Sequence, residues 1–483
     1  MKSTLAWASS LLWLSGCATP GAPASPSAAA AAMDSPPTAS SASPGQQPAD
    51  QVLSERVPGA PALPWQDTPA DAQAVLPEGP LSQDQAVALS LQRSPALRTL
   101  LAQNQAQIAR ARVAARPGLL GFSIERMRQG DDLSWTRTLS LGLMDLLSWP
   151  WRQAAADRRI DLAQQQAARQ VLAHVQTVRV QWVKAVAAQQ RSQYQQDVLQ
   201  AARTAGELAR RMQAAGHFSA AQAAQHAAAA VEAQLAVTQT RRLAVAEREA
   251  LVRLVGLSPQ EASQLALPER LPELPAQAAW TEARLQDAAR TRALDLQLAE
   301  RQWQAARGQG RDENLRGVID LEAAYSRETG HNEATKQGPE LSLRLVNIDF
   351  GAARRDAVRQ EERVALAQWQ QAVLNAESRL RERWQDYEAT LDTAQQAART
   401  LAPVRQQLLN ERLKQYNGML IGPFELLAEA RQHIGGVLTA FDAQRDFWLA
   451  DAALTAAVDG VDLDTPRATP NTAASAASAD AAH

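Results

Sequence analysis

The sequence predicts a mainly α-helical protein with a small β part, organised as two similar halves in tandem. Three observations lead to this fold class. The chain repeats itself at a fixed shift, its longest segments carry a coiled-coil pattern, and two pairs of short segments alternate apolar and polar residues. Hydrophobic residues make up 46% of the 483 residues but aromatic ones only 5%, and much of the apolar fraction is Ala. Because Ala favours helices and buries little area, this composition favours extended helix packing over a thick core.

The charge balance and the Cys content exclude several classes of protein. With 49 Lys and Arg against 51 Asp and Glu, the chain lacks the basic excess that neutralising nucleic-acid phosphates requires, so we expect no nucleic-acid partner. A single Cys excludes a disulfide framework and any site built from several thiolates.

Residues 1–16 have the pattern of a signal peptide, because Lys2 precedes an apolar run that is too short to span a bilayer permanently. The run ends in Leu-Ser-Gly-Cys, which resembles a bacterial lipobox, and its Cys17 is the only Cys of the chain. The resemblance implies that Cys17 receives a diacylglyceryl group and becomes the mature N-terminus. Ala18 follows, where lipoproteins retained in the inner membrane usually carry Asp, so the resemblance implies delivery to the outer membrane, with outer-membrane lipid as a partner. An ordinary signal peptide with an incidental Cys is the alternative.

Two segments are predicted to lack regular structure. Residues 17–80 are rich in Ala, Pro, Ser and Gln, with few large apolar side chains to offset the entropy of ordering, and we expect a disordered lipoprotein tether there. Residues 462–483 have a similar composition and are predicted to be a disordered tail.

A shift of 202 residues superposes one half of the remaining chain on the other. The first repeat covers residues 81–257, the second covers residues 280–461, and a Pro-rich linker at 258–279 joins them. The matched pairs are Leu139 with Leu341, Leu141 with Leu343, Arg152 with Arg354, Val178 with Leu380, Trp182 with Trp384 and Gly216 with Gly418. Each repeat is expected to run helix, hairpin, very long helix, turn, helix.

The long helices are predicted from heptad spacing and from the absence of helix breakers. Neither Pro nor Gly occurs in 152–205, so at ~1.5 Å per residue that helix could reach roughly 80 Å. In the second repeat, 352–417 contains Pro403, which should kink the helix or mark a local unwinding. The seam positions are Val171, Val175, Val178, Trp182 and Ala185 in the first repeat and Leu380, Trp384, Tyr387 and Leu391 in the second.

The hairpins, at about 119–145 and 315–346, have the length and alternation of membrane-spanning β-strands. Between Leu133 and Leu143 one face is mostly Leu and Trp while the other carries Ser, Thr and Gly. A sheet that packs its Leu face on the helices, without meeting lipid, is the alternative, and Arg137 on the apolar face counts slightly in its favour. Four strands cannot close a transmembrane barrel, so spanning strands would require oligomerisation.

These features together resemble the TolC-like outer-membrane efflux family over about residues 81–461. The motifs that carry the resemblance, besides the doubled layout, are Asn347-Ile348-Asp349-Phe350-Gly351 with Arg354-Arg355, Tyr416-Asn417-Gly418-Met419, and Phe424-Glu425-Leu426-Leu427 with Ala430-Arg431. The family implies a homotrimer in which four transmembrane strands per protomer share a twelve-stranded barrel above a long periplasmic α-barrel. It also implies an exit duct that works with a periplasmic adaptor protein and an inner-membrane transporter.

The resemblance also implies roles for the two turns and for an entrance gate. The turns 216–219 and 418–423 resemble the helix tips where adaptors dock, and the residues expected to take part are Gly216, His217, Phe218, Ser219, Gly418, Met419, Leu420 and Ile421. We expect Gly to permit the sharp reversal in both. The family gate often uses two acidic residues three apart; here these positions hold Glu425 and Ala428, with Glu429 one residue later. A solvated helix face is the alternative for Glu425 and Glu429.

Catalysis has no support in the sequence. The six His residues form no ligand spacing with carboxylates or thiols, and no phosphate-binding Gly loop or nucleophile elbow occurs, so we expect no enzyme activity, no metal site and no cofactor. Two functions remain. The first is an outer-membrane exit duct for toxic small molecules or metal ions. The second is a coiled-coil structural lipoprotein of the cell envelope that has no pore.

Overall fold

The computed structural model describes residues 48–65, 76–116, 120–129, 132–316, 319–330, 334–345 and 352–463. The predicted signal peptide with Cys17, the first part of the tether, the junction motif at 347–351 and the tail from 464 onward lie outside these ranges.

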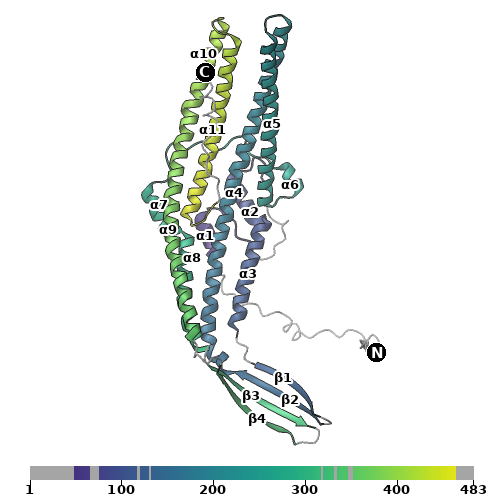
Figure 1. The fold of residues 1–483 in the computed structure, drawn as a ribbon, viewed down its shortest axis with the longest axis vertical. Coiled ribbons are helices and arrows are strands. Elements are labelled where there is room, and N and C mark those ends of the chain that lie inside the picture. The colour runs from purple at the N-terminus through teal and green to yellow at the C-terminus, as the bar shows by residue number, and fades with distance from the viewer. Residues whose placement is uncertain are drawn as a thin grey trace, which may run out of the picture. The chain divides into compact units, whose positions relative to one another are not determined.

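The two halves repeat the same order of elements, which confirms the tandem organisation (Figure 1). The first half contains α2 (Gln83–Arg93), α3 (Pro95–Ala115), β1 (Leu120–Gln129), β2 (Asp132–Gly142), α4 (Leu143–Ala214) and α5 (Ala220–Val255). The short α6 (Pro259–Gln264) lies in the linker. The second half contains α7 (Glu282–Arg292), α8 (Leu294–Arg316), β3 (Ile319–Gly330), β4 (Lys336–Leu345), α9 (Ala352–Gln396), the π-helix η1 (Ala397–Leu401), α10 (Ala402–Asn417) and α11 (Pro423–Val458).

The structure differs from the sequence prediction at the start of each half, where two helices stand in place of one. In the first half the break falls at Ser94, because Pro95 lacks an N–H and disfavours a helical residue before it. The expected third strand also starts later than predicted. Helix α8 continues through Leu315 to Arg316, so the residues expected to open this strand are helical.

The predicted seams form the core. Helix α4 has 72 residues, so it extends roughly 110 Å, and the first-half seam residues Val171, Val175, Val178, Trp182 and Ala185 are all buried along it. The indole Nε1 of Trp182 donates to the carbonyl of Leu81 at 2.8 Å, which ties the start of the repeat to the long helix. In the second half Tyr387 and Leu391 are buried in a separate cluster with Phe447, and Trp384 packs against it. The coiled-coil prediction is therefore confirmed.

The prediction of a disordered tether is wrong for residues 48–65. Helix α1 (Pro48–Arg56) packs against α4, and Leu53 and Leu63 are buried in the main core. Arg56 also forms an ion pair with the buried Asp459 at 3.0 Å. The few large apolar residues of this segment are spaced to meet an existing hydrophobic surface, which a composition average does not reveal.

Helix η1 fulfils the expectation of an irregularity near Pro403. A π-helix adds one residue to a helical turn, and the structure shows where that extra residue goes. Before η1, Trp182 corresponds to Trp384, a shift of 202. After it, the long helices end at Ala214 and Asn417, a shift of 203. The turns are therefore related by 203 rather than by 202.

The four strands form one antiparallel sheet in the order β1-β2-β3-β4, so the hairpins of the two halves lie side by side. Both hairpins lie at the same end of the long helices, and the turns at 216 and 418 lie at the other end (Figure 1). Strands β1 and β4 are the edges, and their outer backbone groups have no strand partner within the described part of the chain.

Candidate functional site: the sheet and the helix tips

One face of the sheet is apolar and turned outward. Side chains directly opposite each other in an antiparallel pair share a face, so the register assigns every strand residue to one side. The apolar face is formed by Leu120, Phe122, Ile124, Leu133, Trp135, Leu139, Leu141, Leu321, Ala323, Tyr325, Pro339, Leu341 and Leu343. Many of these side chains are exposed, among them Leu343 at 62%.

The opposite face is polar and less accessible. In β2, Thr136, Thr138 and Ser140 are half-buried while their apolar neighbours Trp135 and Leu139 are exposed. The apolar face is therefore the open side of the central strands, and the Leu residues do not pack on the helices. This outcome disagrees with the alternative of a sheet that buries its Leu face against the coiled coil. Arg137 does lie on the apolar face, directly opposite Arg327.

Beyond the strands, more apolar side chains remain exposed on the first three turns of α4. Leu146, Leu147, Trp149 and Trp151 lie here. Among the helices that the structure describes, none is both long and apolar enough to cross a membrane.

The two helix tips have the same hydrogen-bond pattern but different residues at the position where φ is positive. In the first turn the N–H of His217 donates to Met212, and Gly216 has a φ of 80°. In the second, the N–H of Leu420 donates to Gln415, and the residue with positive φ is Met419, at 57°. The expectation that Gly makes both reversals is thus wrong for the second turn.

The physical reason for this difference is the extra residue of η1. Because the turns are related by a shift of 203, the structural counterpart of Gly216 is Met419, while Gly418 has an ordinary φ of −82°. Met419 is 92% exposed and its neighbour Leu420 is 78% exposed. The second tip therefore presents two large apolar side chains to its surroundings.

An aromatic stack connects the two tips. The Phe218 ring lies 5.7 Å from that of Phe424, and His226 stacks on both, with centroid distances of 6.1 and 5.8 Å. His226 is buried, and its burial, followed by the nearby charge of Arg431, lowers the pKa of its imidazole. Of the predicted docking residues, Phe218 is thus engaged inside the molecule, and Ser219 caps α5 by accepting from the N–H of Gln222.

The two predicted gate residues have different environments. The Glu425 side chain is 61% exposed and lies 4.0 Å from Arg412, at the limit of an ion pair. The Glu429 side chain is only 15% exposed and faces Arg405 of α10 at 3.4 Å. Glu429 therefore holds α11 against α10, and Glu425 is the carboxylate that remains accessible.

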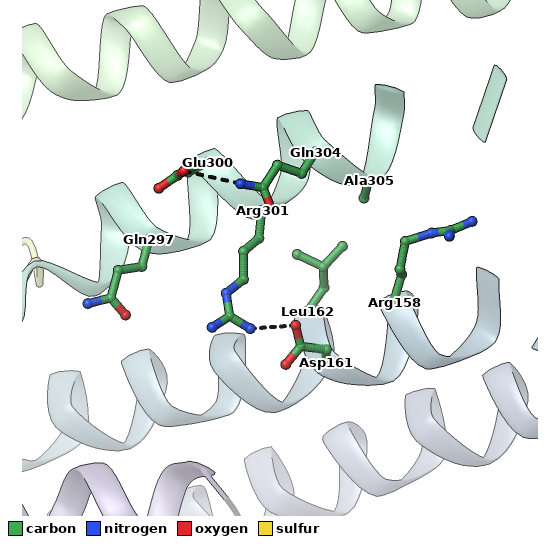
Figure 2. Close-up of a pocket in the computed structure, with 8 residues that line it drawn as sticks. All are labelled: Arg158, Asp161, Leu162, Gln297, Glu300, Arg301, Gln304 and Ala305. Carbon is green, nitrogen blue, oxygen red and sulfur yellow. Dashed lines mark hydrogen bonds and ion pairs between the residues drawn. The ribbon is translucent and has the colours of Figure 1, made fainter. Parts of the chain in front are cut away.

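A polar pocket lies farther toward the sheet, between α4 and α8 (Figure 2). Figure 2 shows Arg301 reaching from α8 to Asp161 of α4, with which it forms an ion pair, while Gln304 donates to Glu300 on the same helix. The charges of Arg301 and Asp161 satisfy each other, so we interpret the pocket as a polar contact between two helices.

Nothing in the described residues suggests a metal centre, since no group of three or more His, Cys, Asp or Glu side chains gathers there. The predicted lipid acceptor Cys17 lies outside the described residues. It stays a prediction.

A scan of protein-family models and a search of curated proteins gave no match. Solved structures do match. The outer membrane protein VceC from Vibrio cholerae superposes with a TM-score of 0.63 at 16% identity, over 78% of this chain and 96% of that one. The Campylobacter jejuni CmeC outer membrane channel gives a TM-score of 0.66 at 10% identity, over 83% and 93%. The Neisseria gonorrhoeae MtrE outer membrane channel gives 0.61 at 17% identity, over 80% and 91%.

The chain has the outer-membrane channel fold. The resemblance to TolC-like proteins that the sequence motifs indicate is confirmed at the level of the fold. The long helices and the small sheet of the described residues are therefore the elements from which the outer-membrane channel fold is built.

Several residues of the candidate site escape the sequence patterns. Arg405 and Arg412 lie on a different helix from the glutamates they face, and nothing in the sequence pairs them. Phe218 lies in the first turn and Phe424 directly follows the second, which is the one signal that could have suggested their contact.

Proposed function

We propose that this protein is the outer-membrane exit duct of a tripartite efflux pump, in which three copies share one transmembrane barrel. The observation that carries the proposal is the four-stranded sheet, whose apolar face is exposed and whose two edge strands have no partner strand among the residues that the structure describes. An exposed apolar sheet with open edges is an aggregation hazard in water, but it is suited to a closed barrel in lipid. The likeness to solved outer-membrane channels supports the same conclusion.

Exposed apolar residues on the helices support a trimer. On α5, Val231 and Leu235 are both largely exposed and lie one turn apart. On η1 and α10, Leu401, Val404 and Leu408 are partly exposed with spacings of three and four. Stripes with this spacing are typical of helix-to-helix seams. In a homotrimer they would be covered by the helices of neighbouring protomers and close a periplasmic α-barrel.

The tips are proposed to bind the periplasmic adaptor protein, which in turn connects the duct to an inner-membrane transporter. Met419 and Leu420 support this assignment, because large apolar side chains at a fully exposed turn are typical of a contact surface. Glu425 is proposed as the gate: three copies around the pore axis would form a ring of carboxylates that favours cations. Glu429 is not needed for it.

Two further elements belong to the proposal. Cys17 carries the lipid that anchors the chain in the outer membrane, and the exported substrates are toxic small molecules or metal ions. The transporter supplies the energy for export, and we expect neither a resident cofactor nor a catalytic step in this chain.

Planar-bilayer recording of the purified oligomer tests the proposed function. We expect ion conductance from a species with three protomers, measured by light scattering in detergent. A trimer that never conducts, with or without adaptor, would instead support the structural lipoprotein without a pore. As a matched control, a variant lacking residues 120–142 and 319–345 should give no conductance.

A further inference from the structure

Four arginines lie on the apolar face of the sheet, toward the hairpin turns, and three of them, Arg126, Arg137 and Arg327, are cross-strand neighbours. The fourth, Arg128, lies opposite Leu133 next to the first hairpin turn. Arg137 of β2 lies directly opposite Arg327 of β3, and Arg126 of β1 lies diagonally across from Arg137. Opposed Cα atoms in an antiparallel pair are about 4.5–5.5 Å apart, and diagonal neighbours about 7–8 Å. All three side chains are exposed on the same face. The three therefore form one compact cationic patch, which we call the arginine cluster.

The arginine cluster lacks anionic partners within the described part of the chain. None of the three guanidinium groups forms an ion pair with an Asp or Glu there, and the Arg126 guanidinium instead lies over the ring of Trp135, 5.5 Å from its centroid. The carboxylates of the neighbouring strands, such as Glu125 and Glu328, belong to the other face. Like charges directly opposite each other destabilise a sheet, so an anion that neutralises the pair would stabilise it.

The position of the arginine cluster limits which anion can reach it. The stretch from Trp149 to Arg137 spans about 10 Å of helix and about 17 Å of strand before any tilt. That sum is close to the ≈25 Å apolar band of outer-membrane barrels. If Trp149 lies at the interface beside the helices, the arginine cluster lies at the opposite edge of the band. Trp135 and Tyr325, on the same face, are aromatic residues of the kind that favour such interfaces.

We propose that the arginine cluster binds the phosphate groups of a phosphorylated lipid headgroup in the outer leaflet. This inference rests on the proposed function, because it requires the apolar face to meet lipid. Guanidinium groups match phosphate oxygens in paired hydrogen bonds, and two opposed arginines can hold one phosphate between them. A ligand approaching on the lipid-facing side carries acyl chains, which the Leu residues nearer the helices can cover. The lipid would thus hold the barrel at a fixed depth.

Native mass spectrometry of the purified trimer in detergent, titrated with lipid A, tests the proposal. The double variant Arg137→Gln and Arg327→Gln should bind lipid A at least about tenfold more weakly, since each hydrogen bond to a charged phosphate contributes about that factor. The Lys336→Gln variant removes a cation from the polar face of β4 and is the matched control, which should bind as the unmodified trimer does.

Three results would overturn the proposal: equal lipid A binding by the double variant, an equal loss in Lys336→Gln, or equal affinity for dephosphorylated lipid A. Inorganic phosphate at millimolar concentration should compete only weakly, and full displacement of the lipid would indicate a site for free phosphate instead. The single variant Arg327→Gln and the salt dependence of binding by the unmodified trimer provide the same test if the double variant does not assemble.

Conductance measured on the same preparation separates the two proposals. A trimer that conducts but binds phosphorylated and dephosphorylated lipid A equally well would support the exit duct and exclude the arginine cluster as a lipid site. A trimer that does not conduct contradicts the duct itself.

Discussion

Met419 adopts a left-handed backbone conformation, with a φ of 57°. Its counterpart in the first repeat, which adopts the same conformation, is Gly216. A left-handed φ costs a residue with a side chain roughly 1–2 kcal/mol, and packing does not offset that cost here because the Met419 side chain is 92% exposed. Its neighbour Leu420 is also exposed and apolar. A strained residue whose side chain points into the surroundings is best explained by a partner that the side chain meets.

Replacing Met419 with Gly should separate stability from docking. The variant should be more stable by about 0.5–1 kcal/mol, since Gly accepts positive φ but loses more entropy on folding. It should bind the adaptor more weakly, because a large apolar contact is gone. Denaturant unfolding and adaptor binding by calorimetry measure the two effects. Met419→Leu is the control that keeps the apolar contact and the strain. Unchanged adaptor affinity in Met419→Gly would remove Met419 from the docking surface.

At the proposed gate, Glu425→Gln should lower the cation preference of the channel without loosening the tip. The substitution removes a ring of three like charges, whose attraction for cations is electrostatic. The matched control is Glu429→Gln, because that carboxylate is paired with Arg405 and is largely buried. The control should weaken the α10–α11 contact and leave selectivity nearly unchanged. Reversal potentials in a salt gradient report the difference. If Glu425→Gln keeps the original permeability ratio, Glu425 is a solvated helix residue.

At the scale of the elements, the sheet has one apolar face and one polar face, and the strand register assigns each residue to one of them. Leu343 belongs to the exposed apolar face and its neighbour Ser342 to the polar one. Adjacent positions in one strand therefore provide a comparison in which the depth along the strand hardly changes while the face of the sheet does.

An Arg at Leu343 should cost roughly 2–4 kcal/mol if it lies near the middle of a bilayer, whereas an Arg at Ser342 should cost much less. The contrast arises because only the first position places a charge in lipid. Reversible unfolding of the barrel in lipid vesicles gives both free energies. Equal tolerance at the two positions would mean that this sheet does not meet lipid.

The elements also show which parts of the fold the sequence could predict. Period-2 alternation and heptad seams are local patterns, so the strands, the long helices and the irregularity near Pro403 could be predicted from them. The docking of α1 could not, because Leu53 and Val57 are sparse apolar residues whose burial depends on a distant surface of α4. The shift from 202 to 203 was equally hidden: Gly216 aligns with Gly418 in sequence, and only the hydrogen bonds of the second turn identify Met419 as the true counterpart. For the two candidate gate residues, the sequence identified Glu425 and Glu429 but not Arg405, the partner of Glu429, and the gate itself stays a prediction.

Helix α1 gives a test at the element scale. Leu53→Ala should destabilise the protein by about 2–4 kcal/mol, the range for a buried Leu truncated in a packed core. Glu55→Ala on the exposed side of the same helix should be nearly neutral. Denaturant unfolding measures both. A neutral Leu53→Ala would restore the view of residues 48–65 as a tether without contacts.

For the whole molecule, stability at acidic pH depends on buried groups whose pKa shifts have opposite effects on the free energy of unfolding. Burial lowers the pKa of His174 to about 4 and raises the pKa values of Asp451 and Asp459 to about 6. Between pH 6.5 and 4, His174 is protonated in the unfolded chain but not in the native state. This residue therefore makes the protein less stable as the pH falls. The two carboxyl groups act in the opposite sense between pH 6 and about 4, because there the native state holds protons that the unfolded state releases.

The variant His174→Gln isolates one side of this balance. On acidification from pH 7 to pH 4, the free energy of unfolding of this variant should fall by up to about 3 kcal/mol less than that of the unmodified protein. Unfolding free energies at several pH values give the difference, in which the contributions of Asp451 and Asp459 cancel. Parallel pH profiles for the two proteins would show that His174 titrates normally in the native state.

The open edge strands β1 and β4 also affect the rate at which the protein inserts into the membrane. If the strands of one copy can be paired only by other copies, insertion into the membrane cannot finish within a single chain. Its rate should then depend on how often copies meet, with a reaction order above one, while the helices of each copy fold independently of concentration. At low expression the slow step would be encounter, and partly assembled copies would wait with their sheets exposed. Such a protein is expected to depend on holding factors during its transit, in proportion to the time spent waiting.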